Sequence, residues 1–239
     1  MQADVVQIPL SQLALAFIPV VMLLYIMYRW SASPAQGLYA IARMLLQLIL
    51  IGYVLTFLFA TDTPVLVIAM LCVMLAAASW IAIRPLRDIG STGRHLTYVL
   101  VAIGSAGGLT LALITLLVLN PDPWFEPRIV VTLGGMIFAS AMNAVSLAAE
   151  RFAAELSGGA VSDTARRNAF QAALIPLLNS LFAVGLVSLP GMMTGQVLSG
   201  IDPLVAVRYQ IMVMCMLTGA SGIAAAIYLT LAARKREPE

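Results

Sequence analysis

The chain has 239 residues, of which 62% are hydrophobic and only 10% are charged, and its formal net charge is +2 at pH 7. A soluble domain carries about 25% charged residues, so this composition excludes a soluble globular protein. The small net charge gives no reason to expect a nucleic-acid partner. An integral membrane protein, with the lipid bilayer as its surroundings, is the class that fits.

Seven stretches of the chain contain no Asp, Glu, Lys or Arg, and each is long enough to cross a bilayer, which takes about 20 apolar residues. The first is expected to be a retained helix, because no basic segment precedes it as in a signal peptide. The second is short, but the uncharged segment before Arg43 extends it. In chain order the stretches are 5–28, 44–61, 63–83, 96–121, 129–149, 168–201 and 209–233.

Basic side chains gather in the connections on one side of the predicted membrane. By the positive-inside rule that side is cytoplasmic, so the N-terminus is predicted to be external and the C-terminus cytoplasmic. The sequence therefore predicts an all-α integral membrane protein of about seven transmembrane helices, forming a single domain over 1–239. The basic residues are Arg29, Arg84, Arg87, Arg94, Arg151, Arg166, Arg167, Arg234, Lys235 and Arg236.

The sequence contains no motif for catalysis or for a resident cofactor. It lacks a GxxxxGK[ST] phosphate loop, an HExxH zinc motif and a Cys/His cluster. The one histidine, His95, falls in a predicted loop, where a solvated role is favoured. Cys72 and Cys215 both fall inside predicted helices, so no disulfide is expected. A transporter or a scaffold is predicted, with no enzyme activity and no cofactor or metal bound by this chain.

Four polar side chains lie at membrane depth in the predicted helices. Arg43 and Gln47 are one turn apart in the second helix and share one face. An ionisable group at this depth usually faces a wet cavity, although Arg43 could also snorkel to the headgroups. Asn143 and Asn179 either form hydrogen bonds between helices or line a substrate path. All four are candidate path residues.

Met192 and Met193 begin a methionine-rich region that continues into the last helix. Thioether sulfur suits soft ions such as Cu(I), but methionine also fills irregular gaps in a core. Both interpretations stay open, with gap filling favoured. If they have a transport role, these two residues also belong to the path.

The sixth stretch, 168–201, is too long for one span and contains Pro176 and Pro190. A helix broken near Pro190, followed by a short re-entrant or interfacial segment, is expected. Irregular backbone at membrane depth is tolerated only against protein or a cavity, so 189–202 is a candidate external gate. Small-residue spacings also predict close helix contacts at Gly104 and Gly108 and at Gly191 and Gly195. The candidate gate residues are Pro190, Gly191, Gly195 and Asp202.

The connection at about 150–167, on the predicted cytoplasmic side, looks the most structured. It is expected to contain a short amphipathic helix, a turn at Gly158 and Gly159, and then the next membrane helix. Asp163 is expected to cap that helix, whose first turns hold Arg166 and Arg167. The connection is either a docking element or a solvated loop with ordinary basic residues.

Three segments resemble a known family. The block Leu-Pro-Gly-Met-Met, Gly-Ile-Asp-Pro and Tyr-Gln within 188–216 is similar to the signature of the FetB family of iron-export ABC permeases, to which plant aluminium-tolerance permeases are related. Segments 43–55 and 172–176 are similar to other parts of the same pattern. The resemblance implies a multi-pass permease of the cell inner (plasma) membrane. It also implies iron as substrate, and two permeases working with two separate ATP-binding subunits that bind the ATP.

The resemblance also gives the predicted loop a role. Glu155 followed by Gly159 and Ala160 is similar to the Glu…Gly-Ala element by which many permeases dock on their ATPases. An ATP-driven exporter is thus the first hypothesis. A facilitator that uses Arg43 and the broken helix without ATP, and a scaffold that transports nothing, are the alternatives. The implied coupling residues are Glu155, Gly159, Ala160, Asp163, Arg166 and Arg167.

Overall fold

The computed structural model describes residues 9–30, 33–60, 63–86 and 92–234, and this part of the chain is helical apart from its connections. The chain divides into two compact units, Met1–Thr61 and Asp62–Glu239. The prediction of an all-α integral membrane protein is confirmed, and six helical segments of the described residues are long and apolar enough to span a membrane. The count of seven, the orientation and the single domain stay predictions.

The first unit contains α1 (Leu10–Leu15), α2 (Ile18–Arg29) and α3 (Pro34–Phe59). A Cβ placed on Gly37 of α3 would lie 2.7 Å from the Leu24 side chain of α2, so this glycine permits the two helices to approach closely. Of the described residues of α2 and α3, Leu58 alone is buried. Their apolar side chains therefore face outward, as expected for helices surrounded by lipid.

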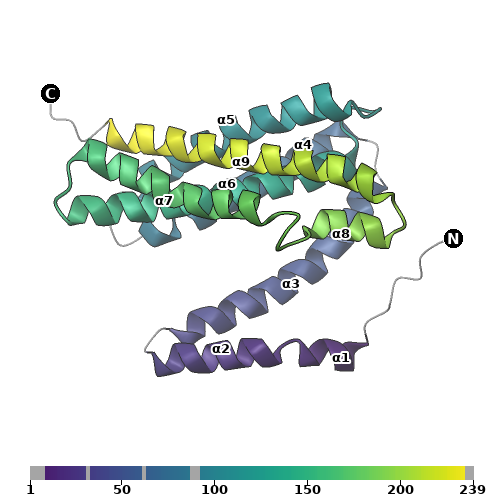
Figure 1. The fold of residues 1–239 in the computed structure, drawn as a ribbon, viewed down its shortest axis with the longest axis horizontal. Coiled ribbons are helices and arrows are strands. Elements are labelled where there is room, and N and C mark those ends of the chain that lie inside the picture. The colour runs from purple at the N-terminus through teal and green to yellow at the C-terminus, as the bar shows by residue number, and fades with distance from the viewer. Residues whose placement is uncertain (1–8, 31–32, 61–62, 87–91, 235–239) are drawn as a thin grey trace. The chain divides into compact units, whose positions relative to one another are not determined.

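The second unit is a helix bundle in which α9 runs along α5, α6 and α7 (Figure 1). Alanine is the most frequent buried residue of α6, α7 and α9, and the Ser221 hydroxyl of α9 donates a hydrogen bond of 2.8 Å to the Ser140 hydroxyl of α6. Small side chains and short polar bonds are the usual means of joining helices in lipid. The helices are α4 (Pro64–Ala82), η1 (Arg84–Leu86), α5 (Thr92–Leu113), the π-helix η2 (Ile114–Leu119), α6 (Pro127–Ser157), α7 (Ser162–Ala183), α8 (Gly191–Leu198) and α9 (Pro203–Ala233).

Of the two α5 glycines predicted to make close helix contacts, only Gly104 does so within the described chain. A Cβ on Gly104 would contact Leu75 of α4 at 3.2 Å, but one on Gly108 would meet no described atom within 4 Å. Gly107 instead makes the close approach to α6, where a Cβ would lie 3.0 Å from both Ile137 and Phe138. The expected contact at Gly108 is therefore wrong, because that position faces a pocket.

The predicted break in the sixth stretch is present, but it begins before Pro190. Helix α7 continues through Pro176 and ends at Ala183. Gly185 then adopts a φ of +82°, a left-handed conformation that few residues other than glycine tolerate. The amides of Val187 and Ser188 donate to the Ala183 carbonyl, and α8 starts after Pro190. The left-handed turn, and not the proline, therefore ends the helix.

Candidate functional site

Residues 150–167, which we name the coupling hairpin, form the connected ends of α6 and α7. Helix α6 has 31 residues, so it is about 46 Å long, against about 30 Å for the hydrocarbon core of a bilayer. Its charge-free segment 129–149 is long enough to cross the core, so the remainder extends about two turns beyond it. The expected short separate helix is therefore the continuous end of α6.

Glu155 joins the two helices of the coupling hairpin. One carboxylate oxygen pairs with the Arg151 guanidinium one turn earlier on α6, and the other accepts a hydrogen bond of 3.2 Å from the Asn168 amide of α7. Only 16% of the Glu155 side chain is exposed. A partly buried carboxylate with charge-assisted bonds is held more firmly than an exposed surface pair. Glu155 thus fixes α6 against the start of α7.

The turn between α6 and α7 has the hydrogen bonds of a Schellman motif. The Gly159 amide donates to the Leu156 carbonyl and the Ala160 amide donates to the Glu155 carbonyl, both at 3.1 Å. Gly159 has a φ of +87°, as this motif requires at the residue after the helix cap. The turn predicted at Gly158 and Gly159 is therefore present, and Gly159 fixes its geometry.

Replacing Gly159 with alanine should destabilise this turn by about 1 kcal/mol, because alanine is strained at positive φ. Gly158 provides a matched control, since its φ is −78° and a Cβ there would make only ordinary contacts. We expect G159A, but not G158A, to accelerate hydrogen exchange of the Gly159 and Ala160 amides in the purified protein. Equal exchange in the two variants would contradict the role assigned to Gly159.

The prediction that Asp163 caps α7 is wrong. Helix α7 begins at Ser162, after Val161, and no side chain caps it. Asp163 lies in the first turn and its carboxylate pairs with Arg166 at 2.6 Å and Arg167 at 3.1 Å. An acidic group in the first turn also interacts favourably with the helix dipole. The three charged groups form one exposed cluster on the coupling hairpin.

The four polar path candidates are divided between the two units. Arg43 is half-buried and Gln47 is exposed on α3 of the first unit. Asn143, on α6 of the second unit, lines a pocket of about 280 Å³ with Ser140 and Ser180. Asn179 is exposed on α7 and does not line that pocket. Of the two asparagines, only Asn143 therefore lines this pocket, and their role in a path stays a prediction.

The proposed gate segment borders a larger pocket, of about 500 Å³, between the end of α7, α8 and α9. Met193 lines it and Met192 does not. A Cβ on Gly191 or Gly195 would meet no described atom within 4 Å, so the predicted close contact at these glycines is absent within the described chain. Asp202 has a structural position: its carboxylate caps α9 by accepting from the amides of Leu204 and Val205. A gating role for this segment stays a prediction.

Among the lining residues of this pocket that sequence reasoning missed, Gln210 is the polar one. Its side chain is 5% exposed, and its amide oxygen has no hydrogen-bond partner among the described residues. Gln210 and Met214 are one turn apart on α9, and both line the pocket. The sequence shows this i, i+4 spacing, but it does not show that the two side chains line one pocket.

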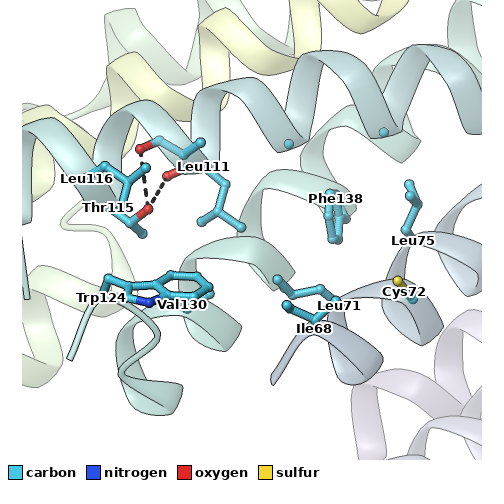
Figure 2. Close-up of a pocket in the computed structure, with 13 residues that line it drawn as sticks. Ile68, Leu71, Cys72, Leu75, Leu111, Thr115, Leu116, Trp124, Val130 and Phe138 are labelled. Carbon is cyan, nitrogen blue, oxygen red and sulfur yellow. Dashed lines mark hydrogen bonds between the residues drawn. The ribbon is translucent and has the colours of Figure 1, made fainter. Parts of the chain in front are cut away.

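A third pocket, of about 280 Å³, lies between α4, α5 with η2, and α6, and Figure 2 shows its lining. Leu71, Leu75, Trp124 and Phe138 form apolar walls. The Thr115 hydroxyl donates to the Leu111 carbonyl of its own helix at 2.8 Å, so it is already satisfied. This pocket suits an apolar group, such as a lipid chain, better than an ion.

Comparisons with known proteins agree with the sequence resemblance. The family model described as "Uncharacterised protein family (UPF0014)" matches residues 10–236. The chain is 34% identical to the "Probable iron export permease protein FetB" of Escherichia coli, over 94% of this chain and 91% of that protein. It is 36% identical to the "UPF0014 membrane protein slr1647" of Synechocystis, over 75% and 74%.

A plant relative extends the comparison. The chain is 29% identical to "Protein ALUMINUM SENSITIVE 3" of Arabidopsis thaliana, over 88% of this chain and 81% of that protein. No solved structure matches the chain. Among its described residues this chain has six helical segments long and apolar enough to span a membrane. The resemblance to the FetB family is confirmed, and the chain belongs to UPF0014.

Proposed function

We propose that this chain is the permease subunit of an ATP-driven exporter that works with a separate ATP-binding subunit. The observation that carries the proposal is the coupling hairpin, a helical extension tied together at Glu155 and closed by a Schellman turn. A connection of this kind can transmit a displacement from a bound partner into α6 and α7, whereas a flexible loop would absorb it. The solvated-loop alternative explains neither the bonds of the Glu155 carboxylate nor the Schellman turn.

The chemical surface of the hairpin suits a protein partner. Asp163, Arg166 and Arg167 are near its turn, and both ion pairs of Asp163 are exposed. Exposed charges of both signs favour specificity and fast encounter more than affinity. We assign ATP hydrolysis to the partner, because this sequence has no phosphate loop. We also propose the implied pairing of two permeases with two ATP-binding subunits in the inner (plasma) membrane.

The proposed substrate class is a metal ion, with iron as the first to test. The support is the name of the Escherichia coli relative, "Probable iron export permease protein FetB", whose match covers 94% of this chain. In proteoliposomes whose ATP-binding subunits face outward, ATP added outside should drive iron into the vesicle lumen, and this accumulation should require both the permease and its ATP-binding partner.

Co-purification with a candidate ATP-binding subunit tests the assignment. We expect a stable complex whose ATP hydrolysis in lipid is inhibited by vanadate. A partner whose phosphate-loop lysine is replaced should bind but not hydrolyse. If the folded permease neither associates with the partner nor supports hydrolysis, the exporter assignment is wrong. Gradient-driven flux by the lone chain would then favour the facilitator, and no flux would favour the scaffold.

A further inference from the structure

A pocket of about 180 Å³ lies between the start of α7 and the end of α9, on the side predicted to be cytoplasmic. We name it the basic pocket, after Arg166 and Arg167, which line it from α7. The two helices pack against each other within the second unit (Figure 1). The pocket combines these two cationic side chains with chiefly apolar residues, namely Phe170, Ala226, Leu229 and Thr230.

The basic pocket lies where both of its helices leave the predicted membrane. The charge-free stretch 168–201 starts directly after Arg167, and the charge-free stretch 209–233 ends directly before Arg234. Two segments that are distant in the sequence therefore place the pocket independently at the boundary between the hydrocarbon core and the lipid headgroups. The headgroup of a phospholipid and the first carbons of its acyl chains meet at the same boundary.

The charged groups around the basic pocket favour an anion. Arg166 and Arg167 each pair through one nitrogen with a different oxygen of Asp163, and their side chains are 44% and 76% exposed. A guanidinium has five N–H donors, so one such contact leaves most of them for another acceptor. Arg234, also exposed, follows Thr230 by one turn of α9. Three arginines thus surround one carboxylate among the described residues, an excess of positive charge.

The apolar part of the lining favours a lipid over a soluble anion. Phe170 and Leu229 line the pocket from positions inside the two charge-free stretches. The Thr230 hydroxyl already donates to the Ala226 carbonyl at 2.7 Å, so its hydrogen is not available to a small anion. Inorganic phosphate would gain nothing from these side chains. A phospholipid would use both parts of the lining, as anionic headgroups do in basic pockets between membrane helices.

We propose that the basic pocket binds a phospholipid with an anionic headgroup, whose phosphate is held by Arg166 and Arg167 and whose acyl chain lies on the apolar lining. The site adjoins the coupling hairpin, because Asn168, which donates to Glu155, directly follows Arg167. This binding goes beyond the exporter assignment and does not depend on it. Since the proposed ATP-binding partner would also contact these arginines, the test uses the permease alone.

Native mass spectrometry of the purified, delipidated full chain measures lipid binding directly. The probes are phosphatidylglycerol, which is anionic, and phosphatidylcholine with identical acyl chains, which has no net charge. We expect phosphatidylglycerol to bind about tenfold or more tightly, and R166A/R167A to lose this preference. R166K/R167K keeps both charges and should retain it. R208A is the matched control, because Arg208 is an exposed arginine of α9 that does not line this pocket.

A second pair of variants tests the pocket separately from the charge. A226W fills the basic pocket and leaves every arginine in place, so it should weaken phosphatidylglycerol binding as strongly as R166A/R167A does. I223W is its control, because Ile223 is exposed on the same helix and does not line this pocket. Equal binding of the two lipids by the unmodified chain, or unchanged binding in A226W, would overturn the proposal. Displacement of phosphatidylglycerol by millimolar inorganic phosphate would overturn the lipid assignment in favour of a free anion.

Discussion

Replacing Glu155 with alanine should uncouple ATP hydrolysis from the permease while leaving the helix bundle folded. The substitution removes the Arg151 ion pair and the Asn168 hydrogen bond together, so the side-chain link between α6 and α7 at the hairpin is lost. Coupling free energies between sites are typically 1–3 kcal/mol, so we expect permease-stimulated hydrolysis to fall about tenfold or more. The measurement is vanadate-sensitive ATP hydrolysis of the reconstituted complex.

Two variants separate this effect from a general loss of charge. Glu150 is also acidic, lies on the same helix and is exposed, so E150A should hydrolyse ATP as the unmodified complex does. E155Q keeps an oxygen that can accept from Asn168 but loses the charge that pairs with Arg151. The rate of permease-stimulated ATP hydrolysis in E155Q should lie between the rates in E155A and E150A. Full stimulation in E155A, with the partner bound normally, would show that the hairpin tie has no part in coupling.

Replacing Gly107 with leucine should destabilise the second unit more than any other change considered for its core. A Cβ at this position already lies 3.0 Å from Ile137 and Phe138, which are 0% and 5% exposed and cannot move outward. Overpacking of a close-packed interior costs about 1–3 kcal/mol or more. We expect a marked fall in the temperature at which purified protein loses its monodisperse elution peak.

The neighbouring glycine is the control for that experiment. Gly108 belongs to the same helix, so the change in helix propensity is the same, but its side-chain position faces the apolar pocket of Figure 2. G108L should therefore be tolerated or slightly stabilising, because leucine fills empty space. Equal destabilisation by G107L and G108L would mean that α5 does not pack on α6 as described.

The membrane helices could be predicted because lipid imposes a strong constraint on sequence. Charged groups are costly at membrane depth, so the uncharged stretches coincide closely with the observed helices. Helix α7 is the exception among the predicted spans. Its first turns contain Asp163, Arg166 and Arg167, and polar amides follow. Helix α7 is therefore not among the six helical segments that are long and apolar enough to span a membrane.

Local details depended on neighbours that a single sequence does not show. The Pro190 signal located the break, but the left-handed Gly185 ends α7 earlier. Asp163 was assigned as a cap because its side chain is suitable, whereas α7 starts one residue before it. Gln210 has no assigned role in the sequence analysis. Its burial depends on how other helices pack against α9, which a single sequence does not show.

The nearly complete outward exposure of α2 and α3 has a consequence for how the protein melts. With Leu58 as the sole buried side chain among their described residues, these helices gain little from an interior, and the bilayer itself supplies most of their stability. Two-state melting requires that all parts share one cooperative core. Calorimetry in bilayers of varied thickness should therefore show a transition of the first unit that depends more strongly on lipid than the transition of the second unit does.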